Sequence, residues 1–168
     1  MSLSLLNAIK REDYELADQL IMNKRGFDET DRNGETPLML LVCKREQHKV
    51  FHELFTKLID AGADVNIKND DGGTALINAM WCDRAIYTVR MLIDAGADVN
   101  IKSNGGWTAL ICAVCYNRQI YTVKMLIDAG ADINIKGNYG RSALIYAAKK
   151  YEPYSHIDAV KMLIEADF

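Results

Sequence analysis

The sequence predicts an all-α solenoid built from successive copies of one helix–loop–helix unit, and two repeated motifs support this prediction. The segment LIDAGADVNIK occupies residues 58–68 and recurs at 92–102, and a third copy at 126–136 differs only at Ile133. A second motif places a threonine or serine two residues after a glycine and follows it with an apolar run. Both motifs recur at a spacing of 34 residues in the central part of the chain. This period is typical of stacked repeats and not of a single closed core.

Each unit is predicted to contain a hairpin turn, a first helix and a second helix, in that order. A threonine or serine hydroxyl that opens an apolar run accepts a hydrogen bond from an unpaired backbone N–H, which favours a helix start. The first helices therefore begin after Thr36, Thr74, Thr108 and Ser142. A glycine such as Gly96 at the end of an amphipathic segment favours a left-handed cap that ends the second helix.

Residues 99–127 show the expected pattern in full. Val99 and Ile101 alternate with polar residues and predict a short extended arm with one buried face. The segment 103–106 has the composition of a hairpin turn. The predicted buried stripes are Leu110, Ala113 and Val114 in the first helix, and Ile120, Val123, Leu126 and Ile127 in the second.

These motifs in register resemble the ankyrin-repeat family, whose unit reads roughly D-x-x-G-x-T-P-L-H-x-A, a helix, a loop, a second helix and G-A-D-V-N. The resemblance is strong over residues 33–168 and weak over 1–32. Only the first strong unit keeps the family's proline, at Pro37. The family's histidine is replaced by Met39, Ile77, Ile111 and Ile145. The resemblance implies an ankyrin-repeat solenoid with short β-hairpin turns, which binds a protein or peptide through its hairpin tips and the concave face of the first helices.

The repeats divide one domain, residues 1–168, into five units. Residues 1–32 form a degenerate N-terminal capping repeat, and 33–70, 71–104 and 105–138 form repeats 1 to 3. Residues 139–168 form an incomplete repeat 4. Longer spacing between equivalent residues predicts insertions between the two helices of repeat 1, near 44–49, and of repeat 4, near 151–154.

Composition argues against several classes of function. The net charge of −3 and pI near 5.6 provide no basic stripe for nucleic acid. We find no apolar run long enough to span a membrane and no secretory leader, so neither membrane nor export is expected. Reduced thiols at the four cysteines favour a cytoplasmic location. These cysteines are Cys43, Cys82, Cys112 and Cys115.

Neither a metal site nor an enzyme active site is predicted. His48 and His52 lie four residues apart beside Glu53, but zinc needs three or four ligands and the remaining histidine, His156, is distant in sequence. Cys112 and Cys115 have Cys-x-x-Cys spacing without a second such pair. We therefore expect no metal, no cofactor and no catalytic residues. The hypothesis that the chain is an enzyme ranks third, and it rests on metal binding by the histidines or cysteines.

Positions that differ between the near-identical repeats are the candidates for partner binding. Tryptophan, tyrosine and arginine dominate interface hot spots, which favours Trp107, Tyr139 and Arg141 on adjacent hairpin tips. The alternative is that each aromatic side chain only covers the neighbouring repeat. We assign Tyr87 and Tyr121, which recur in the second helices, to packing. The predicted set is completed by Trp81, Tyr116, Tyr146, Asp70, Asp71, Asn104 and Asn138.

Three equivalent asparagines, Asn66, Asn100 and Asn134, follow the repeated Asp-Val or Asp-Ile pair. The family resemblance implies that an asparaginyl hydroxylase can modify this position. Turn chemistry favours a structural role instead, in which the side chain hydrogen-bonds the turn backbone.

The last predicted helix, about 157–166, repeats the apolar pattern of the interior helices through Val160, Met162, Leu163 and Ile164. A terminal repeat normally needs a polar outer face, so we expect an adhesive C-terminal edge. Self-association about a two-fold axis, a longer natural chain or a partner would each cover it. The second-ranked function, a substrate-docking or targeting segment of a larger enzyme assembly, rests mainly on this edge.

Overall fold

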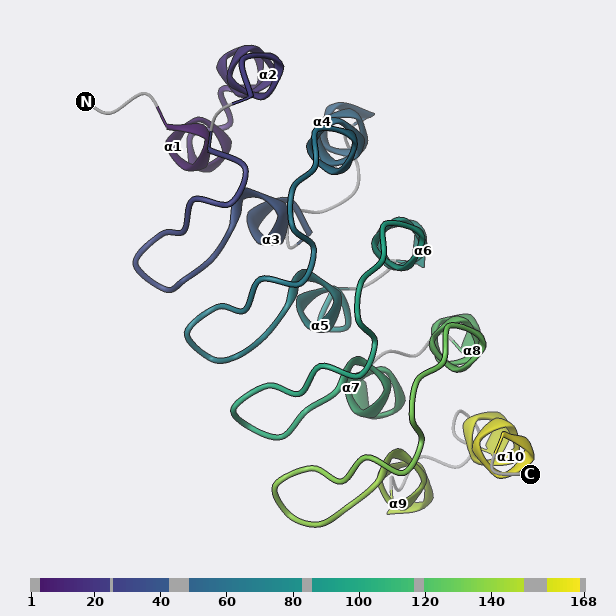
Figure 1. Ribbon diagram of the computed structural model, residues 1–168. Coiled ribbons are helices and arrows are strands. Elements are labelled where there is room, and N and C mark those ends of the chain that lie inside the picture. Colours follow the sequence, from purple (N-terminus) through teal and green to yellow (C-terminus); the bar gives the residue numbers. More distant parts are fainter. Residues whose placement is uncertain are drawn as a thin grey trace.

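The computed structural model describes residues 4–24, 26–42, 49–82, 86–116, 120–149 and 157–166. All regular secondary structure in these ranges is helical, which confirms the predicted all-α class. The helices form an inner and an outer row, and long loops project from the inner row on one side (Figure 1). The inner row is α1 (Leu5–Lys10), α3 (Pro37–Val42), α5 (Ala75–Ala79), α7 (Ala109–Tyr116) and α9 (Ala143–Lys149). The outer row is α2 (Tyr14–Met22), α4 (Lys49–Asp60), α6 (Ile86–Asp94), α8 (Ile120–Asp128) and α10 (Ile157–Glu165).

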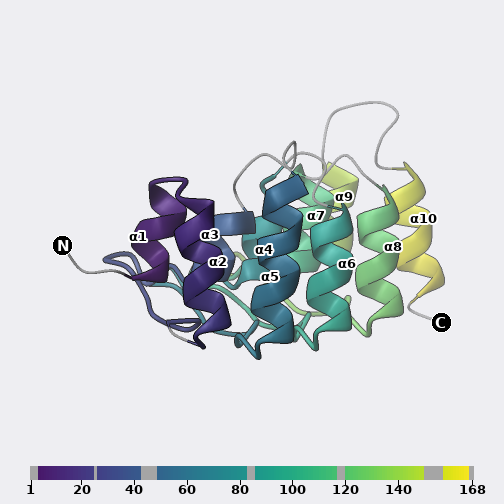
Figure 2. The same ribbon diagram turned by 90° about the horizontal axis from the view of Figure 1, so that it is seen from above.

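The helix pairs follow one another from the N-terminal to the C-terminal end of an elongated molecule (Figure 2). Each inner helix contacts the next inner helix along the chain. Alanines at equivalent positions of α5, α7 and α9 allow this close approach, because their small methyl side chains leave room for the neighbouring helix. These alanines, Ala79, Ala113 and Ala147, are buried as predicted.

The predicted starts of the inner helices are confirmed by hydrogen bonds. The buried Thr74 hydroxyl accepts a bond from the backbone N–H of Ile77 at 3.3 Å. The Thr36 and Thr108 hydroxyls accept bonds from the backbone N–H groups of Met39 and Ile111 in the same way, each at 3.2 Å. The predicted glycine caps of the outer helices are also present, with positive φ angles of 94° at Gly62 and 86° at Gly96 and Gly130.

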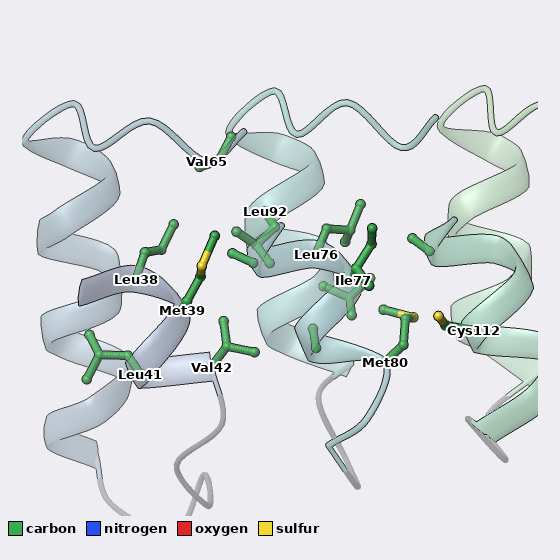
Figure 3. Packing of buried hydrophobic residues seen from close by; sticks show 14 of the residues in the cluster. Leu38, Met39, Leu41, Val42, Val65, Leu76, Ile77, Met80, Leu92 and Cys112 are labelled. Carbon is green, nitrogen blue, oxygen red and sulfur yellow. The ribbon is translucent and has the colours of Figure 1, made fainter. Parts of the chain in front are cut away.

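The core is continuous between the two rows of helices. Met39, Ile77 and Ile111, which replace the family's histidine, are at most 4% exposed, so this position contributes to apolar packing. Figure 3 shows Met80, the residue directly after α5, pointing toward Cys112 of α7, so that sulfur atoms fill part of the interface between consecutive repeats. Most of this core is buried only because the next repeat covers it.

The projecting loops are hairpin turns that stack on one another. The N–H of Asn104 donates to the Asp71 carbonyl at 2.9 Å, and its side-chain amide donates to the Asp70 carbonyl at 2.8 Å. A Cβ atom placed on Gly106 would lie 2.3 Å from the backbone nitrogen of Asn138 in the following hairpin. Glycine is therefore required here both by its φ of 78° and by the close approach of the next turn.

Two details differ from the sequence prediction. The segment 98–101 is a turn and not an extended arm: the N–H of Ile101 donates to the Asp98 carbonyl at 3.4 Å. The cause is the Asp98 side chain, which accepts the Asn100 N–H at 2.9 Å and favours a turn over extension. In addition, Ile120 and Ile127 are only half-buried. The predicted insertions lie outside the described residues, apart from Lys49 at the start of α4.

Candidate protein-binding surface

Four aromatic side chains from three consecutive repeats form a continuous row along the inner helices. Trp81 follows α5, Trp107 precedes α7, Tyr116 ends α7, and Tyr146 lies in α9. The ring centroids of Trp81 and Tyr116 are 4.2 Å apart, those of Tyr116 and Trp107 are 5.7 Å apart, and those of Trp107 and Tyr146 are 5.4 Å apart. These separations are typical of favourable aromatic pairs. We refer to these four residues as the aromatic row.

One end of the aromatic row is exposed and the other is anchored. Trp81 and Tyr116 are 54% and 46% exposed, whereas Trp107 and Tyr146 are half-buried and pack against the core. Burial raises the pKa of the Tyr116 hydroxyl above its usual value, so Tyr116 is uncharged near neutral pH. The contacts with neighbouring rings restrict the exposed side chains of Trp81 and Tyr116.

A hollow of about 370 Å³ opens between the hairpin of repeat 2 and the aromatic row. Trp81 and Trp107 contribute two of its walls, and Ile77 and Asp71 also line it. Its remaining wall is formed by Asn69, Gly73, Asn78, Ser103, Asn104 and Gly105. We refer to this hollow as the tryptophan pocket.

A carboxylate supports the polar wall of the tryptophan pocket. The side-chain amides of Asn69 and Asn78 donate to the two carboxylate oxygens of Glu35, at 2.7 and 3.4 Å. The Asn69 amide oxygen accepts the N–H of Gly73 at 2.7 Å. The sequence analysis missed this group, because Glu35 lies 34 residues from Asn69 and 43 residues from Asn78, and no local pattern links such distant positions.

Two further predicted binding residues, Tyr139 and Arg141, lie on the last hairpin. Tyr139 is 77% exposed and Arg141 is exposed on the last hairpin. Within the described residues, the ring contacts of Trp107 are with Tyr116 and Tyr146, and a shared hot spot of Trp107, Tyr139 and Arg141 stays a prediction.

The predicted residues of the hairpin tips differ in role. Asp70 and Asp71 are exposed, and their main-chain carbonyls accept hydrogen bonds from Asn104. The Asn104 and Asn138 side chains instead bridge successive hairpins, donating to the carbonyls of Asp70 and Asn104 at 2.8 Å. These two asparagines therefore stabilise the stack of turns.

The assignment of Tyr87 and Tyr121 to packing is wrong, since each is 69% exposed. Each tyrosine lies two positions before a fully buried valine, Val89 or Val123. Two residues along a helix correspond to a rotation of about 200°. The tyrosines therefore lie on the outward face of α6 and α8, and they provide exposed aromatic controls away from the aromatic row.

The repeated asparagines connect successive repeats. The Asn100 side chain donates to the Gly130 carbonyl at 3.1 Å and accepts the Asp132 N–H at 2.7 Å. Asn66 makes the equivalent bonds to Gly96 and Asp98, at 3.2 and 2.7 Å. The predicted turn role is therefore present at these two positions, with the addition that the bonded backbone belongs to the next repeat.

The described residues contain no group of three or more potential metal ligands. The Nδ1 atom of His52 lies 3.4 Å from the Thr56 hydroxyl, while His48 and His156 are outside the described ranges. Cys112 is fully buried, and burial raises its pKa to about 12, so it is protonated at neutral pH. No described helix is long and apolar enough to cross a membrane.

The last helix pair carries three exposed isoleucines. Ile145 of α9 is 38% exposed, and Ile157 and Ile164 of α10 are 54% and 45% exposed. These three isoleucines define the C-terminal edge. Leu163, which we expected at this edge, is fully buried, because it lies on the opposite face of α10 and packs into the core.

Comparison with known proteins identifies the repeat. The family model of ankyrin repeats, described as three copies, matches residues 5–103, 48–137 and 87–168. Among solved structures, the chain is similar to an ankyrin repeat domain from Acinetobacter baumannii AYE, with 27% sequence identity and a TM-score of 0.81. The match covers 97% of this chain and 80% of that chain. No curated protein matches the sequence.

Proposed function

Because the chain belongs to the ankyrin-repeat family, whose members are generally protein interaction modules, we propose that it is a non-catalytic module that binds a protein or peptide partner. The proposed contact surface is the aromatic row together with the adjoining hairpin tips. The observation that carries this proposal is the ring-to-ring contact that continues across three repeats while Trp81 and Tyr116 stay about half exposed.

The structural alternative is that each ring only covers its neighbouring repeat. Trp107 and Tyr146 fit that role, since both are half-buried against the core. Trp81 does not, since 54% of its surface remains exposed beside the tryptophan pocket. A large, pre-ordered aromatic side chain at the rim of a hollow is a frequent interface hot spot.

The test begins with partner capture from the source cell by the wild-type chain and by Trp81→Ala, followed by calorimetric titration of the captured partner. We expect Trp81→Ala and Trp107→Ala each to weaken binding by about 2 kcal/mol, the usual size of a hot-spot truncation. Tyr121→Ala is the control, because it removes an exposed ring of the outer row. Far-ultraviolet circular dichroism of each variant reports the fold. Equal affinity of wild type and a folded Trp81→Ala would contradict the proposal.

A second candidate function, docking to a larger enzyme assembly, is favoured by the C-terminal edge. Three exposed isoleucines in one terminal helix pair are suited to contact with another chain. Capture with the double variant Ile157→Lys, Ile164→Lys distinguishes the two candidates. Loss of the partner from this variant, with retention by Trp81→Ala, would favour docking through the edge.

A further inference from the structure

The walls of the tryptophan pocket have a consistent electrostatic character. The one charged residue among its described lining residues is Asp71, and its carboxylate is exposed. Behind the polar wall lies a second carboxylate, Glu35, which accepts the amide groups of Asn69 and Asn78. No described residue of the wall is cationic. The field inside the pocket is therefore that of two negative charges, partly screened by solvent.

The aromatic walls act in the same direction. Trp81 and Trp107 border the pocket, and the faces of indole rings are electron-rich and attract cations. Hydrogen bonds direct the amide nitrogens of Asn69 and Asn78 toward Glu35. The amide oxygens of the same two side chains therefore point away from Glu35. A Cβ atom built on Gly73 would lie 3.1 Å from the Asn78 Oδ1 and 3.2 Å from the Asn69 Oδ1, which places these acceptors at the wall.

Resting on the function proposed above, we propose that the tryptophan pocket takes a cationic side chain, arginine or lysine, from the bound partner. The cation lies between the two indole rings with its charge directed to the Asp71 carboxylate. Its methylene stem contacts Ile77 and the ring edges. The pocket thus selects partner segments that place a basic residue beside the aromatic row.

The chain provides its own reporter for this site. It contains two tryptophans, and both line the pocket, so the intrinsic tryptophan fluorescence reports occupancy of the pocket without a label. The probes are three blocked tripeptides with glycine on either side of arginine, lysine or norleucine. Norleucine has the same apolar stem as lysine and no charge, so it separates the effect of the cation from that of hydrophobic contact.

We expect saturable fluorescence changes with the arginine and lysine peptides, and binding of the norleucine peptide weaker by about fivefold or more, as a cation–π contact with a carboxylate implies. Added salt weakens the cationic probes and leaves norleucine unaffected. Asp71→Asn lowers affinity for the cationic probes by about two- to fivefold, the range for an exposed ion pair.

Asp70→Asn is the matched control. It removes an equal charge from the adjacent exposed residue, which does not line the pocket. Asp71→Asn is expected to fold normally, because the Asp71 group that bonds Asn104 is the main-chain carbonyl. Equal binding of the arginine and norleucine peptides would overturn the inference. An unchanged affinity of Asp71→Asn for the arginine peptide would do the same.

The peptide titration needs no natural partner, so its failure is distinct from failure of the proposed function. A captured partner that loses affinity for Trp81→Ala but binds wild type and Asp71→Asn equally would overturn the cationic pocket and leave the protein-binding function standing. A captured partner that binds both Trp81→Ala and Asp71→Asn more weakly than wild type, but binds Asp70→Asn as tightly as wild type, supports both.

Discussion

The interior repeats and the last repeat share the same motifs but differ in what covers them. Gly106 and Gly140 have similar positive φ angles, 78° and 68°, yet only Gly106 lies against a following hairpin. Ile111 and Ile145 are equivalent in sequence, but their exposed fractions are 1% and 38%. The energetic weight of a residue in this fold is therefore set by the next repeat as much as by its own. Matched substitutions in the two regions can break or sharpen this comparison.

The largest difference is expected for the equivalent isoleucines. Ile111→Ala leaves a cavity in a fully packed position and should lower the free energy of unfolding by about 2–5 kcal/mol. Ile145→Ala removes a side chain that is more than one-third exposed, and its cost should be about 1 kcal/mol. Urea denaturation followed by circular dichroism measures both. Similar losses for the two variants would show that the C-terminal edge is buried in solution.

The hairpin glycines give a second comparison. Alanine at Gly106 or Gly140 carries the same cost of a positive φ angle, so this cost cancels between the variants. A new methyl group at Gly106 would lie 2.3 Å from the Asn138 nitrogen, whereas at Gly140 it meets no described atom within 4 Å. Gly106→Ala should therefore destabilise the fold by about 1–3 kcal/mol more than Gly140→Ala, the range for an overpacked site.

Thermal and urea unfolding of these two variants report the difference directly. The contact that separates them is between backbone atoms, which cannot move aside as a flexible side chain does. Equal destabilisation of the two variants would mean that the hairpins do not stack in solution as they do here.

The sequence was sufficient to predict the all-α fold, the threonine caps and the glycine caps, because each depends on residues close together in the chain. Thr74 caps α5, which starts at the next residue, and Gly96 lies two residues after the last residue of α6. Such local rules are carried by the 34-residue repeat itself. The family resemblance adds the stacking order, which is confirmed by the solved structure that the chain resembles.

The candidate site was predictable only in part. Residue type and variation among repeats selected Trp81, Trp107, Tyr116 and Tyr146, which the structure brings into one row. The same reasoning could not find Glu35 behind the polar wall of the tryptophan pocket, since its partner Asn78 lies 43 residues away. Nor did it place Tyr87 correctly, because repetition alone does not say which face of a helix a side chain occupies.

The asparagines that join successive repeats give a third, smaller effect. Asn100→Ala removes one donor to Gly130 and one acceptor for the Asp132 N–H, which are exposed bonds. We expect a loss of about 1 kcal/mol and a lower melting temperature, since a typical hydrogen bond contributes about this much. Asn100→Asp keeps the acceptor and should recover part of the loss. An unchanged melting temperature for Asn100→Ala would contradict the bridging role.

Hydroxylation of Asn66, Asn100 and Asn134 remains a prediction from the family resemblance. Because Asn66 and Asn100 already use both ends of their amide groups, we expect slow modification of the folded chain. Incubation with an asparaginyl hydroxylase and 2-oxoglutarate, followed by mass spectrometry, measures it as a gain of one oxygen atom per modified site. Faster modification of Asn100 in the destabilised Gly106→Ala variant than in the wild type would show that stacking protects the site.

The smallest effect on the stability of the fold is expected at the C-terminal edge, where we predict weak self-association through Ile145, Ile157 and Ile164. A dimer with a two-fold axis is the commonest symmetric arrangement, and in such a dimer the same isoleucines of both chains are buried. The double variant Ile157→Lys, Ile164→Lys should lower the association constant by about thirtyfold or more, since each of the two lost apolar contacts is worth on the order of 1 kcal/mol.

Sedimentation equilibrium over a wide concentration range measures this association. Leu163 is unsuitable for substitution, because it is fully buried and a charge there would disrupt the core. Tyr87→Lys, Tyr121→Lys is the matched control, since it adds the same two charges to exposed positions of the neighbouring outer helices. If the control dissociates as readily as the edge variant, net charge and not the isoleucine contact governs the association. A strictly monomeric wild-type chain at high concentration would eliminate the dimer and leave the exposed isoleucines for another partner.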